Sequence, residues 1–145
     1  MRPLGVAVGT EAAPPSVVVR PLGGVAKRLS EAVSVLRDVP GFVSAAVARR
    51  DGLVIHHTLK TGREAAVLCA MTAVMVTSSR TTGEHLKGGG FLHSIVRYAD
   101  LDLVIAEAGS EAILACLLAR GANLGLALMK MKSAAKLVEE ALDAL

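Results

Sequence analysis

The chain has 145 residues, of which 52% are hydrophobic, 20% are charged and only 2% are aromatic, and its formal net charge is +3. This composition excludes a disordered chain, because disordered chains are poor in apolar residues and rich in charge. It also argues against a dedicated single-strand nucleic-acid binder, since such proteins stack bases on aromatic rings and this chain has no Trp.

The N-terminal residues predict a loose arm over 1–20, followed by one domain over 21–145. Pro3, Pro14 and Pro15 break any helix in the arm. The arm lacks the apolar core of a signal peptide, so we expect a cytoplasmic protein. The longest uncharged run, residues 65–79, is shorter than the roughly 20 apolar residues that a membrane span requires, and it predicts a buried helix instead.

The first elements of the domain are a helix and a hairpin. From Pro21 to Leu36 the apolar residues recur at helical spacing, which predicts an amphipathic helix that ends before Pro40-Gly41. Two apolar runs then flank Arg50-Asp51-Gly52. An Asp-Gly pair between apolar runs predicts a β-hairpin, because both residues tolerate positive φ.

A second helix is predicted over about residues 63–86, and it is apolar on nearly every side between Ala65 and Val76. Such a helix is buried on more than one side. One face can pack on the sheet, and we expect another element to pack on the second apolar face. A line of small residues on one side would let an identical helix from a second subunit approach closely. We call this line the small-residue stripe; it comprises Ala66, Ala70, Ala73 and Thr77.

Three strands and a last helix complete the chain. The strands are expected over residues 91–98, 103–108 and 112–119, and Asp100-Leu-Asp102 and Gly109-Ser-Glu111 are read as the turns between them. Short connections of this kind join antiparallel neighbours. Gly88-Gly-Gly90 is expected to stop the second helix. The element order α-β-β-α-β-β-β-α predicts an α+β domain, a five-stranded antiparallel sheet with helices on both faces.

The last helix has the most regular apolar spacing in the chain, running from Leu124 to Leu145 in alternating steps of four and three. Asn123 is its predicted N-cap. Met131 belongs to its buried side. With Met129, it also allows an alternative interpretation as a methionine-rich groove for a partner, since methionine adapts to irregular surfaces.

The residues with reactive side chains form no recognised catalytic or metal-binding motif. His56 and His57 are neighbours on a strand, so their side chains point to opposite faces. No Cys-x-x-Cys or His-x-x-x-His spacing occurs. Cys69 and Cys116 stand in apolar runs, where burial makes a thiol unreactive. We therefore predict no metal, no cofactor, no catalytic residue and no enzymatic activity.

Several of these segments together resemble the Roadblock family, the dynein light-chain type. Residues 39–55 show its hairpin pattern, an apolar residue, Pro-Gly, a strand, Asp-Gly and a second strand. The alanine-rich second helix is similar, and so are residues 102–114 with the long helix behind them. The resemblance covers about residues 22–145.

The resemblance implies a homodimer that regulates or scaffolds a Ras-like small GTPase, as the MglB type of the family does, without a catalytic side chain of its own. It implies that two copies pair through the second helix and the third strand into one continuous sheet. On this basis the expected interface residues are Ala66, Ala70, Ala73, Val74, Thr77, Leu92, Ser94 and Val96.

Two other functions stay open at this point. A small enzyme with a Cys/His site between subunits predicts rapid alkylation of Cys69 or Cys116. A nucleic-acid binder with a basic arm predicts steeply salt-dependent binding. Its candidate residues are Arg2, Arg20, Lys27 and Arg28.

Overall fold

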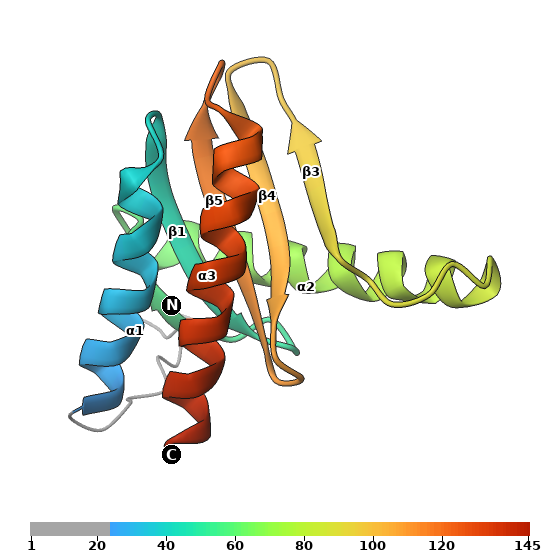
Figure 1. Cartoon of the computed structure of the whole chain (residues 1–145), viewed down its shortest axis with the longest axis horizontal. Helices are drawn as coiled ribbons and strands as arrows, with labels where there is room; N and C mark the ends of the chain where they lie inside the picture. Colours follow the sequence, from blue (N-terminus) through green and yellow to red (C-terminus); the bar gives the residue numbers. More distant parts are fainter. Residues whose placement is uncertain (1–23) are drawn as a thin grey trace, which may run out of the picture.

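A computed structural model describes residues 24–145 of the chain (Figure 1). The predicted arm over residues 1–20 lies outside the described residues. The helices are α1 (Gly24–Ser34), α2 (Gly62–His85) and α3 (Leu124–Asp143), and a short 3-10 helix, η1 (Val35–Asp38), continues α1. The strands are β1 (Phe42–Arg49), β2 (Val54–His57), β3 (His93–Arg97), β4 (Leu101–Ala108) and β5 (Ala112–Ala119).

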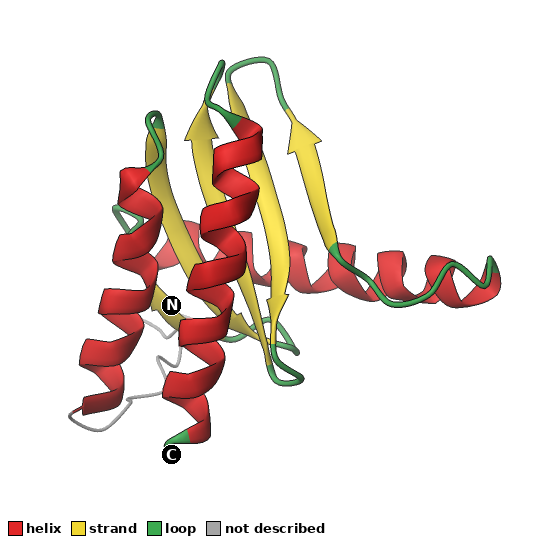
Figure 2. Ribbon diagram, in the orientation of Figure 1, coloured by secondary structure: helices red, strands yellow, loops and turns green. Residues whose placement is uncertain are grey.

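The five strands form one antiparallel sheet in the order β2-β1-β5-β4-β3. Helices α1 and α3 cover one face, and α2 crosses the other (Figure 2). The predicted fold class and element order are therefore confirmed. None of the helices within residues 24–145 has the length and apolar character that crossing a bilayer requires.

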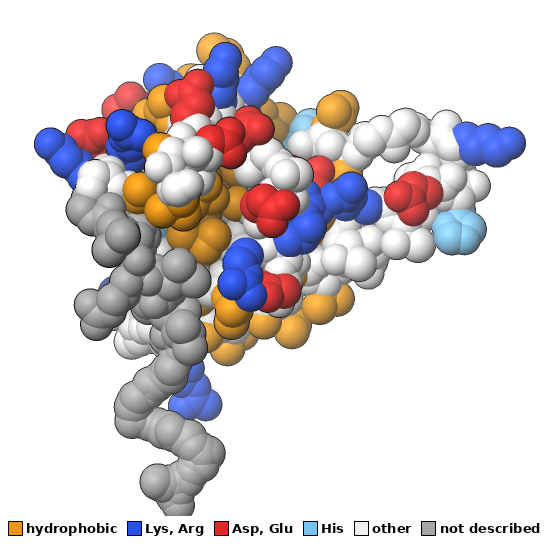
Figure 3. Space-filling view, turned by 90° about the horizontal axis from the view of Figure 1, so that it is seen from below, with side chains coloured by type: hydrophobic (Ala, Val, Ile, Leu, Met, Phe, Trp, Pro, Cys, Tyr) orange, Lys and Arg blue, Asp and Glu red, His pale blue; other side chains and the backbone are white. Residues whose placement is uncertain are grey.

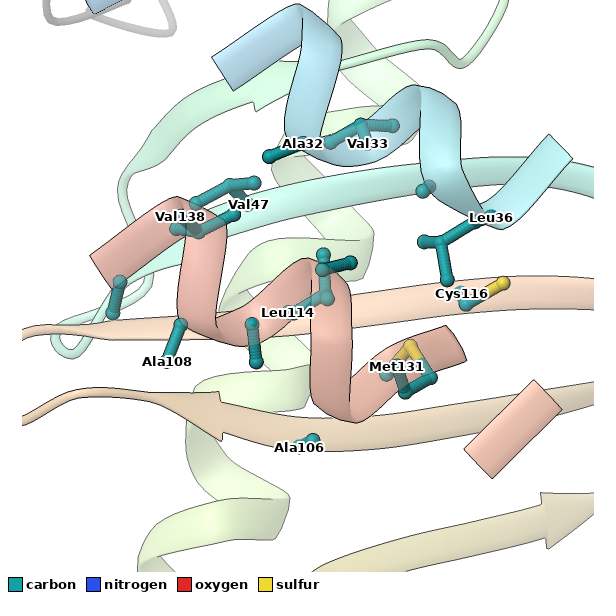
Figure 4. Packing of buried hydrophobic residues seen from close by; sticks show 14 of the residues in the cluster. Ala32, Val33, Leu36, Val47, Ala106, Ala108, Leu114, Cys116, Met131 and Val138 are labelled. Carbon is teal, nitrogen blue, oxygen red and sulfur yellow. The ribbon is translucent and has the colours of Figure 1, made fainter. Parts of the chain in front are cut away.

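The core between the sheet and the α1–α3 layer follows the predicted helical spacing. Val33 and Leu36 project from α1 and η1 onto the sheet, and Met131 and Val138 project from α3 (Figure 4). Alanines fill the remaining positions of α3 that face the sheet, which lets the helix lie close to β4 and β5. Asn123 caps α3 as predicted, because its Oδ1 accepts the backbone N–H of Leu126 at 3.0 Å.

Helix α2 builds a second, smaller core on the other face of the sheet. The hydroxyl of Thr61 accepts the backbone N–H of Glu64 at 3.1 Å and caps the start of the helix. Cys69 and Val76 point into this core, and no α2 residue after Val76 is buried within the described chain. The helix then runs on past the edge strand β3 (Figure 1).

The structure corrects the predicted turn at residues 100–102. Leu101 and Asp102 begin β4, and Asp102 pairs in register with Arg97 of β3. Its carboxylate is fully buried and accepts a hydrogen bond from Arg97 Nε at 3.1 Å. The cross-strand arginine thus allows an acidic residue inside a strand, where sequence alone indicates a turn.

Two helix ends also differ in detail from the sequence prediction. The first helix is α-helical only to Ser34 and continues as the tighter η1. The second ends at His85, and the left-handed residue behind it is Lys87, with φ 55°, rather than a glycine. Gly88 donates its N–H to the carbonyl of Gly83 at 2.8 Å, which closes the last turn.

Candidate functional site

The outward side of α2 exposes large apolar side chains. Val67, Met71 and Val74 stand at helical spacing and are 59%, 51% and 58% exposed. Hydrophobic side chains also gather along the edge of the molecule farthest from α1 and α3 (Figure 3). Contiguous apolar surface of this kind marks an interaction site in a soluble protein.

Beside this line lies a groove of about 720 Å³ between α2 and the sheet, which we call the outer groove. Leu68, Met71 and Met75 form its wall on α2, and Leu103 and Leu117 lie on the sheet. Its further apolar lining residues are Val43, Leu59, Val67 and Tyr98.

The outer groove contains a buried hydroxyl without a partner. Thr72 is fully buried, lines the groove, and its Oγ1 has no hydrogen-bond partner among the described residues. A buried polar group without a hydrogen bond costs about 1–3 kcal/mol. The described residues therefore leave this cost at Thr72 uncompensated.

Strand β3 supplies an open sheet edge next to α2. It pairs with β4 and has no neighbour on its other side within the described residues. Leu92, just before the strand, is 81% exposed, whereas Ser94 and Val96 are partly buried. An edge strand offers unpaired backbone groups to another strand.

The small-residue stripe lies on the side of α2 that meets the β1–β2 hairpin. A Cβ added to Gly52 would stand 3.1 Å from the Cα of Ala70 and 3.5 Å from the Cβ of Ala73. The small side chains thus let the hairpin approach α2. Only Gly52 of the Asp-Gly pair adopts positive φ, +97°.

The predicted interface residues consequently divide into three groups. Ala70, Val74, Thr77 and Leu92 are exposed, and Ala66, Ser94 and Val96 are partly buried. Ala73 is 7% exposed and belongs to the core between α2 and its own sheet. The sequence analysis did not include Val67 and Met71 among the interface residues. Each directly follows a residue of the small-residue stripe, so the same helical spacing could have identified them.

A carboxylate fixes α2 against the hairpin. Glu107 Oε2 of β4 accepts a hydrogen bond from Arg80 Nη1 of α2 at 2.9 Å and forms an ion pair with Arg50 Nη2 at 2.7 Å. Arg50 also donates from Nε to the carbonyl of Ser110 at 2.6 Å. These contacts join α2 to β4 and to the turn of the hairpin.

The reactive side chains form no common site in the described chain. Burial raises the pKa of the Cys69 thiol to about 11 and that of Cys116 to about 12. The two cysteines belong to the cores on opposite faces of the sheet. No group of three or more His, Cys, Asp or Glu side chains within residues 24–145 is placed to hold a metal ion.

The two adjacent histidines likewise point apart, as expected. His56 pairs with Val47 and His57 with Ala46, and these partners belong to opposite cores. Burial, with a smaller contribution from the neighbouring His57, lowers the pKa of His56. A neutral histidine on a strand beside a core is the arrangement of a structural residue.

Comparison with known proteins connects this geometry to one domain type. The sequence model of the Roadblock/LC7 domain matches residues 29–118, which include α2 and β3. The Roadblock/LC7 domain from Streptomyces avermitilis is 25% identical, with a TM-score of 0.72 over 76% of this chain and 92% of that chain. Among curated proteins, no sequence matches the chain significantly.

Two solved structures of MglB share the fold at lower identity. The gliding protein MglB from Thermus thermophilus has a TM-score of 0.77 at 21% identity, over 90% of this chain and 98% of that chain. MglB from Myxococcus xanthus has a TM-score of 0.75 at 15% identity, over 87% of this chain and 96% of that chain.

Proposed function

Because the chain belongs to the Roadblock/LC7 domain family, we propose that it is a homodimeric, cytoplasmic interaction module that regulates or scaffolds a Ras-like small GTPase. The observation that carries the proposal is the apolar surface of α2 and the outer groove, which residues 24–145 leave uncovered. A surface of this type binds macromolecules, and the described residues around it offer no activated nucleophile.

In the proposed dimer, α2 of the partner lies antiparallel in the outer groove, and β3 pairs with its own copy. After Val76, α2 no longer packs on its own sheet and extends past β3. With a two-fold axis near this point, the C-terminal end of each α2 would lie over the sheet of the other subunit. The proposed contact residues on α2 are Val67, Leu68, Met71, Met75 and Ser79, with Leu92, Ser94 and Val96 on the β3 side.

This arrangement gives a role to the polar end of α2. Ser79 and Thr82 stand on the same side of the helix as Leu68 and Met75, at helical spacing. In an antiparallel pair we expect them to lie beside the part of the other subunit's α2 that contains Leu68 and Met75. The proposal keeps Ala66, Ala70 and Thr77 at the margin and moves the centre of the interface from the small-residue stripe to the outer groove.

The two alternative functions have less support. A Cys/His site would need an ionised thiol, and the pKa values of both thiols are strongly raised by burial. Of the candidate basic residues, Lys27 and Arg28 are exposed on α1, whereas Arg2 and Arg20 lie outside the described residues.

The GTPase part of the proposal is tested by affinity capture from an extract of the native cell. The immobilised protein is incubated with the extract plus GDP or a non-hydrolysable GTP analogue, and bound proteins are identified by mass spectrometry. We expect a Ras-like GTPase that is retained preferentially with the analogue. Retention with both nucleotides would indicate a scaffold, and recovery of no GTPase would contradict the proposal.

A further inference from the structure

On the face covered by α1 and α3, no helix of the described residues lies above the edge strand β3 (Figure 1). Helix α3 packs on β4 and β5. The flank of α3 and the uncovered strand therefore meet at an angle and leave an open channel on the side of the sheet opposite to the outer groove.

This channel, which we call the α3–β3 trough, has a volume of about 660 Å³. Leu92 on the strand side and Met129 on α3 line it and are 81% and 67% exposed. Ala106, Met131 and Ala135 are buried residues that also line it. Two strongly exposed large apolar side chains on opposite walls of one channel form a surface suited to an apolar ligand.

The dimensions of the trough match a short helix. Its lining residues on α3 run from Gly125 to Glu139, which at 1.5 Å per residue corresponds to about 21 Å. A helix of three to four turns has this length, and such a helix beside α3 would complete the layer over β3. Amphipathic helices commonly bind in grooves through apolar residues at i, i+3, i+4 and i+7.

The charged side chains along the trough favour a partner of negative charge. Lys132 and Lys136 line it one helical turn apart, and neither forms an ion pair with another residue of the 24–145 region. Glu139 lies at the end of the trough beside Gly109. Glu107 of β4 also lines the trough, but its carboxylate is paired with Arg50 and with Arg80 of α2, the helix on the other face of the sheet.

From these observations we propose that the α3–β3 trough binds an acidic amphipathic helix of another protein. The apolar side of that helix contacts Leu92 and Met129, and its carboxylates face Lys132 and Lys136. Methionine side chains adapt to partners of varied shape, which suits a docking site of this type. The trough shares Leu92 with the proposed pairing of β3, whereas Met129, Lys132 and Lys136 on α3 take no part in the proposed dimer contacts.

The test uses two synthetic helical peptides of 16 residues with leucines at i, i+3, i+4 and i+7. One carries Glu on both flanks of its apolar side, and the matched peptide carries Lys there. Fluorescence anisotropy measures binding to the full chain, and methyl NMR of methionines locates it. We expect the acidic peptide to bind at least tenfold more tightly and to shift the Met129 and Met131 methyl signals while leaving Met71 unchanged.

Charge reversal makes the test specific to the trough. The double variant Lys132→Glu, Lys136→Glu should bind the basic peptide more tightly than the acidic one, whereas Lys27→Glu on α1 should leave the preference of the native protein unchanged. Met129→Ser should weaken binding at least fivefold, and Leu137→Ser, an exposed α3 residue outside the trough, should not. Circular dichroism of each variant confirms that it is folded.

Three results would overturn the proposal. Equal affinity of the native protein for both peptides, or absence of binding, would show that the trough does not select an acidic helix. Methyl shifts at Met71 in place of Met129 would move the binding site to the α2 face. A fall in particle mass on Met129→Ser, measured by light scattering, would show that a second copy of the chain occupies the trough.

Discussion

Cys69 and Cys116 illustrate how the sheet separates side chains that are alike in sequence. Each stands in an apolar run, and each is buried, but they lie in different cores with the sheet between them. Neither can therefore form a disulfide with the other in the folded chain. Burial in apolar surroundings disfavours the thiolate and raises both pKa values.

We expect both thiols to resist alkylation in the native protein. At pH 8, pKa values of about 11 and about 12 leave only about one thiolate in a thousand at Cys69 and one in ten thousand at Cys116. Iodoacetamide labelling followed by mass spectrometry should be at least a hundredfold slower in buffer than in guanidinium chloride. Fast labelling of the native protein would instead support the small enzyme with a Cys/His site.

At the scale of elements, the relation between the β1–β2 hairpin and α2 decides which side of that helix is free. Apolar spacing predicts α2 and indicates that a second element packs on the side of the helix away from the sheet. The spacing does not show which side of α2 remains free for a partner, because the contact of Gly52 with Ala70 and Ala73 exists only in the folded arrangement of the hairpin and the helix. The small-residue stripe therefore accommodates the hairpin, and the large side chains Val67 and Met71 stay exposed.

Substitution of Gly52 tests this contact. Gly52→Ala places a Cβ 3.1 Å from the Cα of Ala70 at a φ of +97°, which side chains rarely adopt, so we expect a loss of about 1–3 kcal/mol in the free energy of unfolding.

Gly121→Ala is the matched control, since Gly121 has φ +85° but no atom within 4 Å of an added Cβ. Urea unfolding at one protein concentration should show a larger loss for Gly52→Ala. Equal losses would mean that the hairpin does not rest on α2.

Features that depend on residues close in the chain are predicted from the sequence, whereas features that depend on contacts between distant elements are not. The Asp-Gly hairpin, the Asn123 cap and the spacing of α3 depend on residues close in the chain, and the structure confirms them. The strand position of Asp102 depends on Arg97 across the sheet, and the β-strand signal of Leu101 alone is too short to predict it. The grooves arise only from the packing of whole elements, so no local pattern contains them.

On the scale of the whole molecule, the chain has open apolar surface on both faces of one sheet. The outer groove lies beside α2, and the α3–β3 trough lies on the opposite face. The outer groove reaches Tyr98, directly after β3, and the trough reaches Leu92 and His93 at the start of this strand. A dimer joined at the β3 edge would bury the outer groove and contact Leu92 at the rim of the trough, whereas the α3 wall of the trough, with Met129, Lys132 and Lys136, lies away from the proposed dimer contacts.

The mass of the particle in solution tests the proposed dimer most directly. Multi-angle light scattering of the native protein should give twice the 14.9 kDa mass of one chain. Met71→Glu should give the mass of a single folded chain, because the interface would bury an unpaired carboxylate.

Met129→Glu and Ala70→Glu are the controls for this measurement. Met129 is a comparably exposed methionine on the opposite face, and Ala70 lies on the hairpin side of α2, so we expect both variants to remain dimers. A native protein of single-chain mass, or a Met71→Glu variant that stays dimeric while Ala70→Glu dissociates, would contradict an interface centred on the outer groove.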